Sequence, residues 1–389
     1  MLASAQQIKP RLVELRRAIH RQPELGFEVH RTAELVARTL NELGIETRTG
    51  VGRTGVVGYL GDGDGPVIAI RADMDALPIL EANAVDYASE VPGSMHACGH
   101  DAHTAMLLGA AMLLARGPLA GQVRLIFQPS EEAFDAEGVS GAPRMIADGA
   151  LDGVDHVIAL HVSPDLYTGT IAVETGQVNG ADDTFIGHVL GRAGHGAHPH
   201  QALDAIWLAA QVLQALYAVP ARRVAPLQPA VLSLGIVRGG TASNIIPDSV
   251  YLEGTLRSLD SGVREQLLDE VRRCFEIARA LGGDYNLEFQ RGYPSLYNDP
   301  AVVGLIRGAA ADLLGEGALV PGRVTLGVED FSYMAAHSPG AMFRLGVRAP
   351  GAAARHVHTP GFDIDEDALP IGAALLAESA LRLLANPDN

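Results

Sequence analysis

The chain has 389 residues, of which 48% are hydrophobic, so it is long enough for two or three domains with large buried cores. Its formal net charge is −17, which argues against a nucleic-acid partner because such a partner demands basic stripes that replace phosphate counterions. Lys9 is the only lysine, which excludes Schiff-base, Walker-type ATPase and protein kinase chemistry, since each needs a lysine positioned at its site.

The N-terminal segment has the pattern of an ordinary amphipathic helix, without the apolar block of a signal peptide. No apolar run approaches the roughly 20 residues that span a bilayer. The two cysteines, Cys98 and Cys274, are too few and too far apart for a disulfide framework. We therefore expect a soluble cytoplasmic protein with no membrane partner.

The first part of the chain interleaves predicted helices and strands. Helical patterns cover residues 5–21, 29–43 and 104–116, and short β-like runs cover residues 54–60, 66–71, 123–128 and 156–160. This alternation is typical of an α/β domain with a parallel or mixed sheet. The glycine cluster at residues 61–65 fits no phosphate-binding spacing and is expected to form a turn between strands.

Residues 182–292 have a different order of elements. Strands are expected at 184–190, 231–237, 249–256 and 286–290, and helices at 202–217 and 262–281. The order β-α-β-β-α-β is the ferredoxin-like pattern. Helices return at 301–314 and 366–384. We predict a two-domain α/β protein: a catalytic domain with a mixed sheet, residues 1–181 and 293–389, and an inserted ferredoxin-like α+β domain, residues 182–292.

Polar side chains follow three strands of the predicted catalytic domain. The strands are followed by Asp73 and Asp75, by Glu131 and Glu132, and by His161, in that order. In open α/β sheets, ligands bind beyond the carboxyl ends of the strands. Because unpaired charges beside a core are costly, this set of side chains indicates a functional site at that edge.

Residues 96–103 contain three histidines, one cysteine and one aspartate. Thiolate and imidazole are good ligands for zinc and the neighbouring transition metals. Cys98 and His100 alternate, so in an extended loop both side chains would point the same way. A single cysteine or histidine is more often structural, but this density just before a predicted helix indicates metal binding.

Glu131 and Glu132 form a second candidate feature. Adjacent carboxylates at the end of an apolar strand repel each other unless a cation lies beside them. One would serve as a metal ligand and the other as general base toward a metal-activated water. A solvated acidic turn is the competing interpretation, because two further acidic residues follow closely.

The C-terminal loop before the last helix offers two more histidines, His356 and His358. Their alternation lets one of them face a site, and an exposed loop histidine is the competing interpretation. From spacing alone the choice between the two stays open.

Two other classes of function compete with a metal-dependent enzyme. A serine or cysteine hydrolase could use Cys98 or a serine as nucleophile, but the chain has no Gly-x-Ser-x-Gly elbow. A non-catalytic module could hold structural metals and bind a ligand between its domains. Glu131 argues against that module, because a structural metal site has no use for a spare base.

Motifs spread over nearly the whole chain resemble those of one family: RRAIH (16–20), PELG (23–26), RADMDALP (71–78), MHACGHD (95–101), QPSEE (128–132), GHGAHPH (194–200), SNIIPD (243–248), EDFS (329–332) and HTP (358–360). The family is that of the metallo-aminoacylases and carboxypeptidases, which are di-metal peptidases. The resemblance is to the branch that holds hippurate hydrolase, the plant auxin–amino acid conjugate hydrolases and the bacterial N-acyl-amino acid amidohydrolases.

The resemblance implies a metal-dependent amidohydrolase that cleaves the amide bond of N-acyl amino acids, such as hippurate-like, N-acetyl or indole-acetyl conjugates. A metallo-carboxypeptidase or dipeptidase acting on small peptides is the alternative. Glu131 matches the general base. The family's ligands for two divalent ions (zinc, manganese, nickel or cobalt) are matched by Cys98, His100, Glu132, His161 and His358.

The resemblance also implies that the inserted domain is a lid and a homodimerisation module. His195 matches a histidine that stabilises the oxyanion, from the same subunit or across the dimer. Asn244 and Arg257 match lid positions that bind substrate, and Arg257 suits a substrate carboxylate. Asp75 is expected to orient a ligand or the general base. Asp73 stands where relatives outside the branch carry a ligand histidine, and it is not counted as a ligand.

Overall fold

The computed structural model describes residues 1–61 and 65–386. The chain forms two compact units: unit 1 comprises Met1–Gly176, Tyr297–Arg323 and Asp330–Asn389, and unit 2 comprises Gln177–Leu296 and Val324–Glu329. The segment 182–292, predicted as an inserted domain, lies wholly within unit 2. Part of the turn predicted at residues 61–65 lies outside the described residues.

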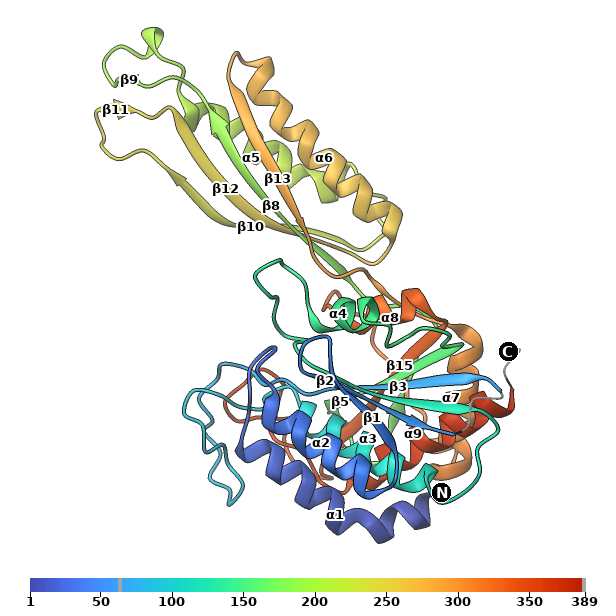
Figure 1. The fold of residues 1–389 in the computed structure, drawn as a ribbon. Coiled ribbons are helices and arrows are strands. Elements are labelled where there is room, and N and C mark those ends of the chain that lie inside the picture. Colours follow the sequence, from blue (N-terminus) through green and yellow to red (C-terminus); the bar gives the residue numbers. More distant parts are fainter. Residues whose placement is uncertain (62–64, 387–389) are drawn as a thin grey trace. The chain divides into compact units, whose positions relative to one another are not determined.

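Unit 1 is built on a seven-stranded sheet in the order β1-β2-β4-β3-β5-β15-β6 (Figure 1). The four central strands, β4, β3, β5 and β15, run parallel to one another, whereas β1, β2 and β6 pair antiparallel, so the sheet is mixed as predicted. The strands are β1 Glu46–Val51, β2 Gly55–Leu60, β3 Val67–Asp73, β4 Gln122–Gln128, β5 His156–Tyr167, β6 Ile171–Ala172 and β15 Gly340–Arg348.

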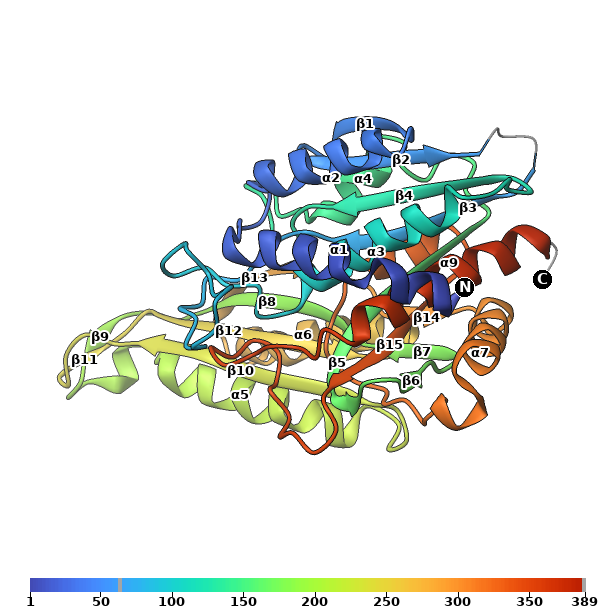
Figure 2. The same cartoon turned by 90° about the horizontal axis from the view of Figure 1, so that it is seen from below.

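Helices cover both faces of this sheet. Helices α1, α2, α3 and α9 lie on one face, with α3 packed against both α1 and α9 (Figure 2), and α4 and α8 lie on the other face. Helix α7 packs against α9. The helices are α1 Leu2–Arg21, α2 His30–Glu42, α3 His100–Leu114, α4 Gly141–Ala147, α7 Pro300–Leu314, η2 Glu316–Ala318, α8 Phe331–His337 and α9 Ala368–Ala385.

Helices α3 and α9 are apolar on nearly every side because both are central in unit 1. Helix α9 is long and apolar enough to cross a membrane by length and composition, which the sequence analysis did not recognise. However, 72% of this helix is buried inside the structure, as expected for the core helix of a globular unit.

Several predicted boundaries were wrong, and several elements were missed, including β15, which lies between β5 and β6 in the sheet. Helix α3 begins at His100, four residues earlier than predicted, so Cys98 and His100 do not alternate along an extended loop. Strand β1 was missed because charged residues on an exposed edge hide its pattern. The short helices α4 and α8 were also missed, since seven residues carry little periodic signal.

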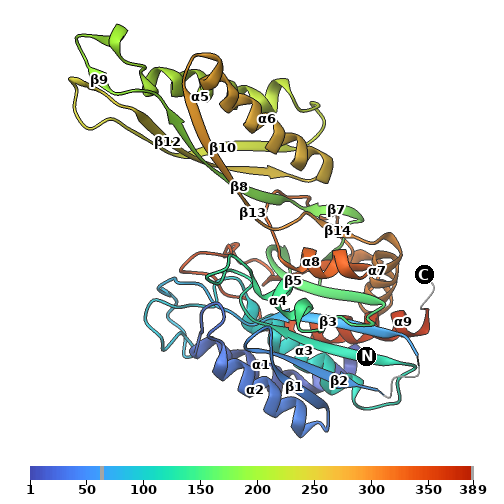
Figure 3. The same cartoon turned by 45° about the horizontal axis from the view of Figure 1, so that its top comes forward.

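Unit 2 contains a four-stranded antiparallel sheet in the order β10-β12-β8-β13, with α5 and α6 packed together beside it (Figure 3). This is the predicted ferredoxin-like arrangement. Two short strands, β9 and β11, form a separate pair, as do β7 and β14. The elements are β7 Gly176–Asn179, β8 Ala181–Leu190, β9 Gly194–His195, η1 Pro199–Gln201, α5 Ala205–Arg222, β10 Ala230–Gly239, β11 Ile245–Ile246, β12 Ser249–Ser258, α6 Ser261–Ala280, β13 Asp284–Arg291 and β14 Leu296–Asn298.

A buried charge cluster joins α1 to α3 inside unit 1. The Arg16 guanidinium, which has no exposed surface, donates from Nε to Asp101 Oδ2 at 2.7 Å and from Nη2 to Asp363 Oδ1 at 2.8 Å. His20 Nδ1 lies 2.8 Å from the same Asp101 oxygen, and His20 Nε2 lies 3.2 Å from Glu81 Oε1. Burial lowers the pKa of His20, but Asp101 and Glu81 outweigh it and raise the pKa to about 9.

This shift predicts a loss of stability at alkaline pH. A histidine with a pKa near 9 in the folded chain and near 6.5 when unfolded stabilises the fold fully below pH 6.5, and the contribution disappears between pH 6.5 and 9. The difference corresponds to about 3 kcal/mol. Urea unfolding of wild type and His20→Gln at pH 6, 7, 8 and 9 should give free-energy differences that shrink as pH rises. A free-energy difference between wild type and His20→Gln that is the same at all four pH values would contradict the raised pKa of His20.

Candidate metal centre

Five side chains from four segments of unit 1 converge on one cluster. Their ligand atoms form overlapping groups within 4.8 Å: one group of Cys98, His100 and His161, and a second of Cys98, Glu132 and His358. These are the five residues predicted as metal ligands. One thiol, three imidazoles and one carboxylate form a donor set suited to zinc and the neighbouring transition ions. The residues present therefore fit divalent metal.

The turn between Cys98 and His100 depends on glycine. Gly99 has a φ of +89°, and a Cβ atom there would lie 2.4 Å from Val162 Cγ2. The turn places His100 at the first position of α3, where its Nδ1 lies 2.8 Å from the Asp75 carbonyl oxygen and donates to it. His100 Nε2 is buried and makes no hydrogen bond within the described part of the chain. A cation would satisfy this nitrogen.

His161 and His358 complete the cluster from β5 and from the loop before α9. His161 Nδ1 donates to the carbonyl oxygen of Val162 at 2.8 Å, and its Nε2 lies 3.4 Å from Cys98 Sγ. His358 has a φ of +59°, and its backbone N–H donates to the Ala97 carbonyl at 2.8 Å. His358 Nε2 lies 3.1 Å from Glu132 Oε1. A strained backbone of this kind is common at ligand sites.

The structure brings His358, and not His356, into the cluster. The His356 side chain is 66% exposed, and its charged neighbour is Asp165 Oδ1, 3.5 Å from its Nδ1. It belongs to none of the candidate metal groups of the described residues. The choice that spacing left open is thus decided by the turn around His358.

Asp75 holds the two glutamates through their backbone. Its Oδ1 accepts the Glu131 N–H at 3.0 Å, and its Oδ2 accepts the Glu132 N–H at 3.1 Å. Ser130, just before the pair, has a φ of +51°, which turns the chain at the end of β4. Both glutamates reach the cluster, because Glu131 Oε2 and Glu132 Oε1 each lie 4.0 Å from His100 Nε2. The carboxylates therefore meet at one imidazole nitrogen.

The charges in the cluster shift each other's protonation. Burial lowers the pKa of His100, but Asp73 and Cys98 outweigh it and raise the pKa well above its ordinary value. Burial raises the pKa of the Cys98 thiol. Hydrogen bonds to Cys98 and Glu132 raise the pKa of His358 to about 10. Shifted pKa values gathered in one buried cluster are typical of a functional site.

Asp73 lies beside the cluster but is held by other groups. Its Oδ2 accepts from Arg71 Nη1 at 2.6 Å, and its Oδ1 lies 2.6 Å from His103 Nδ1. Arg71 also donates to Asp330, which accepts from Gln128 as well. Sequence reasoning gave no role to Arg71, His103, Gln128 or Asp330. The available signal was a set of polar residues at the buried ends of β3 and β4.

The three predicted lid residues lie in unit 2. His195 is in β9 and pairs with Ile245 of β11, and its Nδ1 accepts the Ala197 N–H at 3.0 Å. The carbonyl of Asn244 accepts the Gly196 N–H at 2.8 Å, so Asn244 and His195 are near neighbours. Arg257 in β12 donates from Nη1 to the Leu326 carbonyl at 3.1 Å. Their contribution to the metal cluster of unit 1 remains a prediction.

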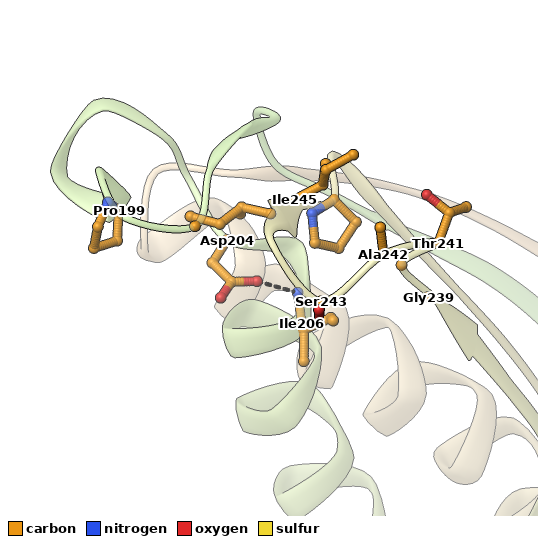
Figure 4. Close-up of a pocket in the computed structure, with 12 residues that line it drawn as sticks. Pro199, Asp204, Ile206, Gly239, Thr241, Ala242, Ser243 and Ile245 are labelled. Carbon is orange, nitrogen blue, oxygen red and sulfur yellow. Dashed lines mark hydrogen bonds between the residues drawn. The ribbon is translucent and has the colours of Figure 1, made fainter.

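A pocket of about 610 Å³ in unit 2 is lined by sequence neighbours of His195 and Asn244, among them Gly196, Ser243 and Ile245 (Figure 4). Asp204, which lines the pocket, caps the N-terminus of α5 by accepting a hydrogen bond from the Ile206 N–H at 2.8 Å. The pocket contains none of the predicted metal ligands. Its lining is formed by Gly196, Pro199, Asp204, Ile206, Gly239, Gly240, Thr241, Ala242, Ser243, Ile245, Ile246 and Pro247.

The geometry of Asp75 leads to a prediction. Asparagine has one acceptor oxygen in place of two, so Asp75→Asn should leave the Glu131 or the Glu132 N–H unpaired and loosen both carboxylates. Loss of such an outer-sphere contact typically costs 10- to 100-fold in metal affinity or activity. Metal content and steady-state rates should fall together, while Asp86→Asn, at an exposed aspartate, should match wild type. Unchanged metal content and rates in Asp75→Asn would contradict this role.

Comparison with known proteins places the chain among metal-dependent hydrolases. Residues 69–382 match the model of peptidase family M20/M25/M40. The chain is 42% identical over 381 residues to the N-acetyl-L-cysteine deacetylase of Bacillus subtilis, covering 97% of this chain and 89% of that protein. It is 40% identical to thermostable carboxypeptidase 2 of Saccharolobus solfataricus, covering 95% of each. Its fold matches the crystal structure of the Bacillus subtilis YXEP protein, described as a dinuclear metal binding peptidase, with a TM-score of 0.85, 35% identity and coverage of 98% and 99%.

Proposed function

Because the chain belongs to peptidase family M20/M25/M40 and is a metal-dependent hydrolase of amide bonds, we propose that it cleaves N-acylated amino acids into a carboxylic acid and a free amino acid. The observation that carries this proposal is the position of Glu131. Its carboxylate lies at a five-residue donor cluster while its backbone is held by Asp75. The deacetylase relative is named for a reaction of this class.

The proposed ligands of two divalent ions are Cys98, His100, Glu132, His161 and His358, with zinc, manganese, nickel or cobalt as candidate ions. When bound, such ions supply a nucleophilic water at neutral pH and a Lewis acid for the amide oxygen. The hydrogen bonds from Nδ1 of His100 and of His161 to backbone carbonyls support this set, because they leave Nε2 of both rings for metal.

In the proposed reaction Glu131 acts as general base. It takes the proton from the attacking water and returns it to the amide nitrogen, so that the C–N bond breaks to release a neutral amine instead of an amide anion. Asp75 keeps the Glu131 backbone fixed during both transfers. His195 is proposed to stabilise the charge on the carbonyl oxygen, and Asn244 and Arg257 to bind the substrate, with Arg257 suited to its carboxylate.

A carboxypeptidase or dipeptidase activity is the second candidate. The carboxypeptidase relative supports it, and hydrolysis of a peptide bond requires the same base and the same ions. The two activities differ in what lies on the acyl side of the amide bond: an uncharged acyl group or an aminoacyl group with an ammonium. A substrate panel therefore separates them.

We further propose a cytoplasmic homodimer formed through unit 2, with His195 reaching the site of the second subunit. Strand β10 is an edge strand, and Val231 and Val237 on it are 39% and 53% exposed. Helix α5, which contacts β10, exposes Trp207 and Tyr217 by 47% and 60%. An exposed apolar edge of this length favours pairing with another chain.

The proposed base leads to a direct test. Metal-reconstituted wild type should hydrolyse members of a panel of N-acetyl, N-benzoyl and indole-acetyl amino acids, with dipeptides included for the second candidate. Glu131→Ala should keep its metal and lose at least about a hundredfold in rate, because it lacks the proton acceptor. Glu137→Ala, in the same loop but exposed, should behave as wild type. Full activity of Glu131→Ala would contradict the two-metal mechanism.

Mixing two inactive variants tests the dimer. If His195 acts across the dimer, a heterodimer of Glu131→Ala and His195→Ala subunits has one intact site, because the two defects fall in the same site. An equimolar, randomly reassembled mixture should then regain about a quarter of wild-type activity. Light scattering should report a dimer for each protein. Monomers, or a mixture as inactive as its components, would overturn the arrangement.

A further inference from the structure

His103 lies between the two histidines of the metal cluster that come from α3 and β5. It is 1% exposed, and its ring centroid lies 5.4 Å from that of His100 and 4.8 Å from that of His161. Neither the sequence pattern nor the proposed reaction gives it a role. A buried imidazole in this position needs partners for both of its nitrogens.

The hydrogen bonds of His103 define its tautomer. The backbone N–H of Val162 points at His103 Nε2 over 3.0 Å. An amide nitrogen only donates, so Nε2 accepts and carries no proton. Nδ1 therefore carries the proton and donates to Asp73 Oδ1, 2.6 Å away. His103 thus connects the side chain of β3 to the backbone of β5.

Asp73 is itself fixed on several sides. Arg71 Nη1 donates to its Oδ2 at 2.6 Å, and Thr104 Oγ1 donates to its carbonyl oxygen at 2.8 Å. Arg71 Nη2 donates to Asp330 Oδ1 at 2.9 Å. The acceptor of the His103 proton is therefore a buried carboxylate with its own balanced charge, and not a mobile side chain.

His103 and His161 contact the backbone of the same residue, Val162, through the two peptide groups on either side of its Cα atom. The Val162 N–H donates to His103, and the Val162 carbonyl accepts from His161 Nδ1 at 2.8 Å. This second hydrogen bond sets which way the His161 ring faces, with its Nε2 toward Cys98 Sγ. A shift of the Val162 backbone would therefore turn the ring of His161, a proposed metal ligand.

We propose that His103 is a positioning residue: by accepting the Val162 N–H it fixes the Val162 backbone, whose carbonyl orients the His161 ring for metal binding, while Asp73 maintains the required His103 tautomer. The proposal rests on the proposed function only in that His161 is a metal ligand. It assigns no contact between His103 and substrate or metal.

The same geometry argues against a third metal site. Asp73, His100 and His103 have ligand atoms within 4.8 Å of one another. However, both Asp73 oxygens accept hydrogen bonds, and His103 Nε2 faces an amide proton. A cation there would have to displace the Val162 N–H. Wild type and a His103 variant that keeps both hydrogen bonds should bind the same number of ions.

Three variants separate positioning from packing. His103→Gln retains an acceptor for Val162 and a donor for Asp73, whereas His103→Leu retains only the volume. Leu107→Ala is the matched control, one turn later on α3 and fully buried, where truncation costs stability without touching the network. For each protein we would measure thermal stability, zinc dissociation, the absorption spectrum of the cobalt-substituted protein, and kcat and KM on the panel.

We expect His103→Leu to weaken binding of one ion about 10- to 100-fold and to shift the cobalt bands, because His161 loses its orientation. Its kcat should fall more than its KM rises. His103→Gln should lie close to wild type, and Leu107→Ala should lose stability with an unchanged cobalt spectrum. Equal metal affinity and equal spectra for His103→Leu and Leu107→Ala would overturn the proposal.

A measurement on wild type covers the case in which His103→Leu does not fold. Imidazole nitrogen NMR of the zinc-loaded protein should show that His103 is the tautomer protonated at Nδ1. The His103 signals are assigned as those that disappear from the spectrum of His103→Gln. Protonation at Nε2 would overturn the proposal. The metal-binding and NMR measurements do not require substrate turnover. If wild type hydrolysed no member of the substrate panel, that result would contradict the proposed substrate class but not the proposed role of His103.

Discussion

The site depends on one constraint, the crowding of ionisable side chains around His100. Six of them have ligand atoms within 4.8 Å of a ring nitrogen of His100: Asp73, Cys98, His103, Glu131, Glu132 and His161. Parallel strands β3, β4 and β5 end at one edge, so the residues that follow them gather there. Two carboxylates lie 4.0 Å from a buried nitrogen that has no hydrogen-bond partner among the described residues. Desolvated groups of this kind are stable together only with protons or a cation among them, and the donor set selects a transition-type divalent ion.

Around that cluster, the backbone does much of the positioning. Asp75 holds Glu131 and Glu132 by their N–H groups, the Asp75 carbonyl orients His100, and the Ala97 carbonyl holds the His358 turn. The proposed base, Glu131, and the proposed ligand next to it, Glu132, are therefore both held by one aspartate. This dependence explains why replacing Asp75, which is not itself a proposed ligand, is expected to affect metal and rate together.

Buried ion pairs fix how the helices and strands around the cluster pack against one another. Asp73 is balanced by Arg71, and Asp101, next to His100, is balanced by Arg16 and His20. Removing one partner of such a pair leaves an uncompensated buried charge. The Asp101 network begins on α3, which carries the proposed ligand His100, and the Asp73 network reaches α3 through His103, so the stability of unit 1 and the geometry of its cluster depend on shared contacts.

Local sequence determined the parts of this protein that repeat or alternate. The β-α-β-β-α-β order of residues 182–292, the strands β2, β3, β4 and β5 of unit 1 and the grouping of Cys98, His100, Glu131 and Glu132 could be predicted, because periodicity and residue chemistry are local properties. Only the tertiary structure began α3 at His100 and gave His103 its partners, and it also placed in the cluster His358, which the family resemblance had favoured over His356. Those outcomes depend on a left-handed Gly99, a strained His358 and hydrogen bonds between residues 30 to 60 positions apart, which no local pattern encodes.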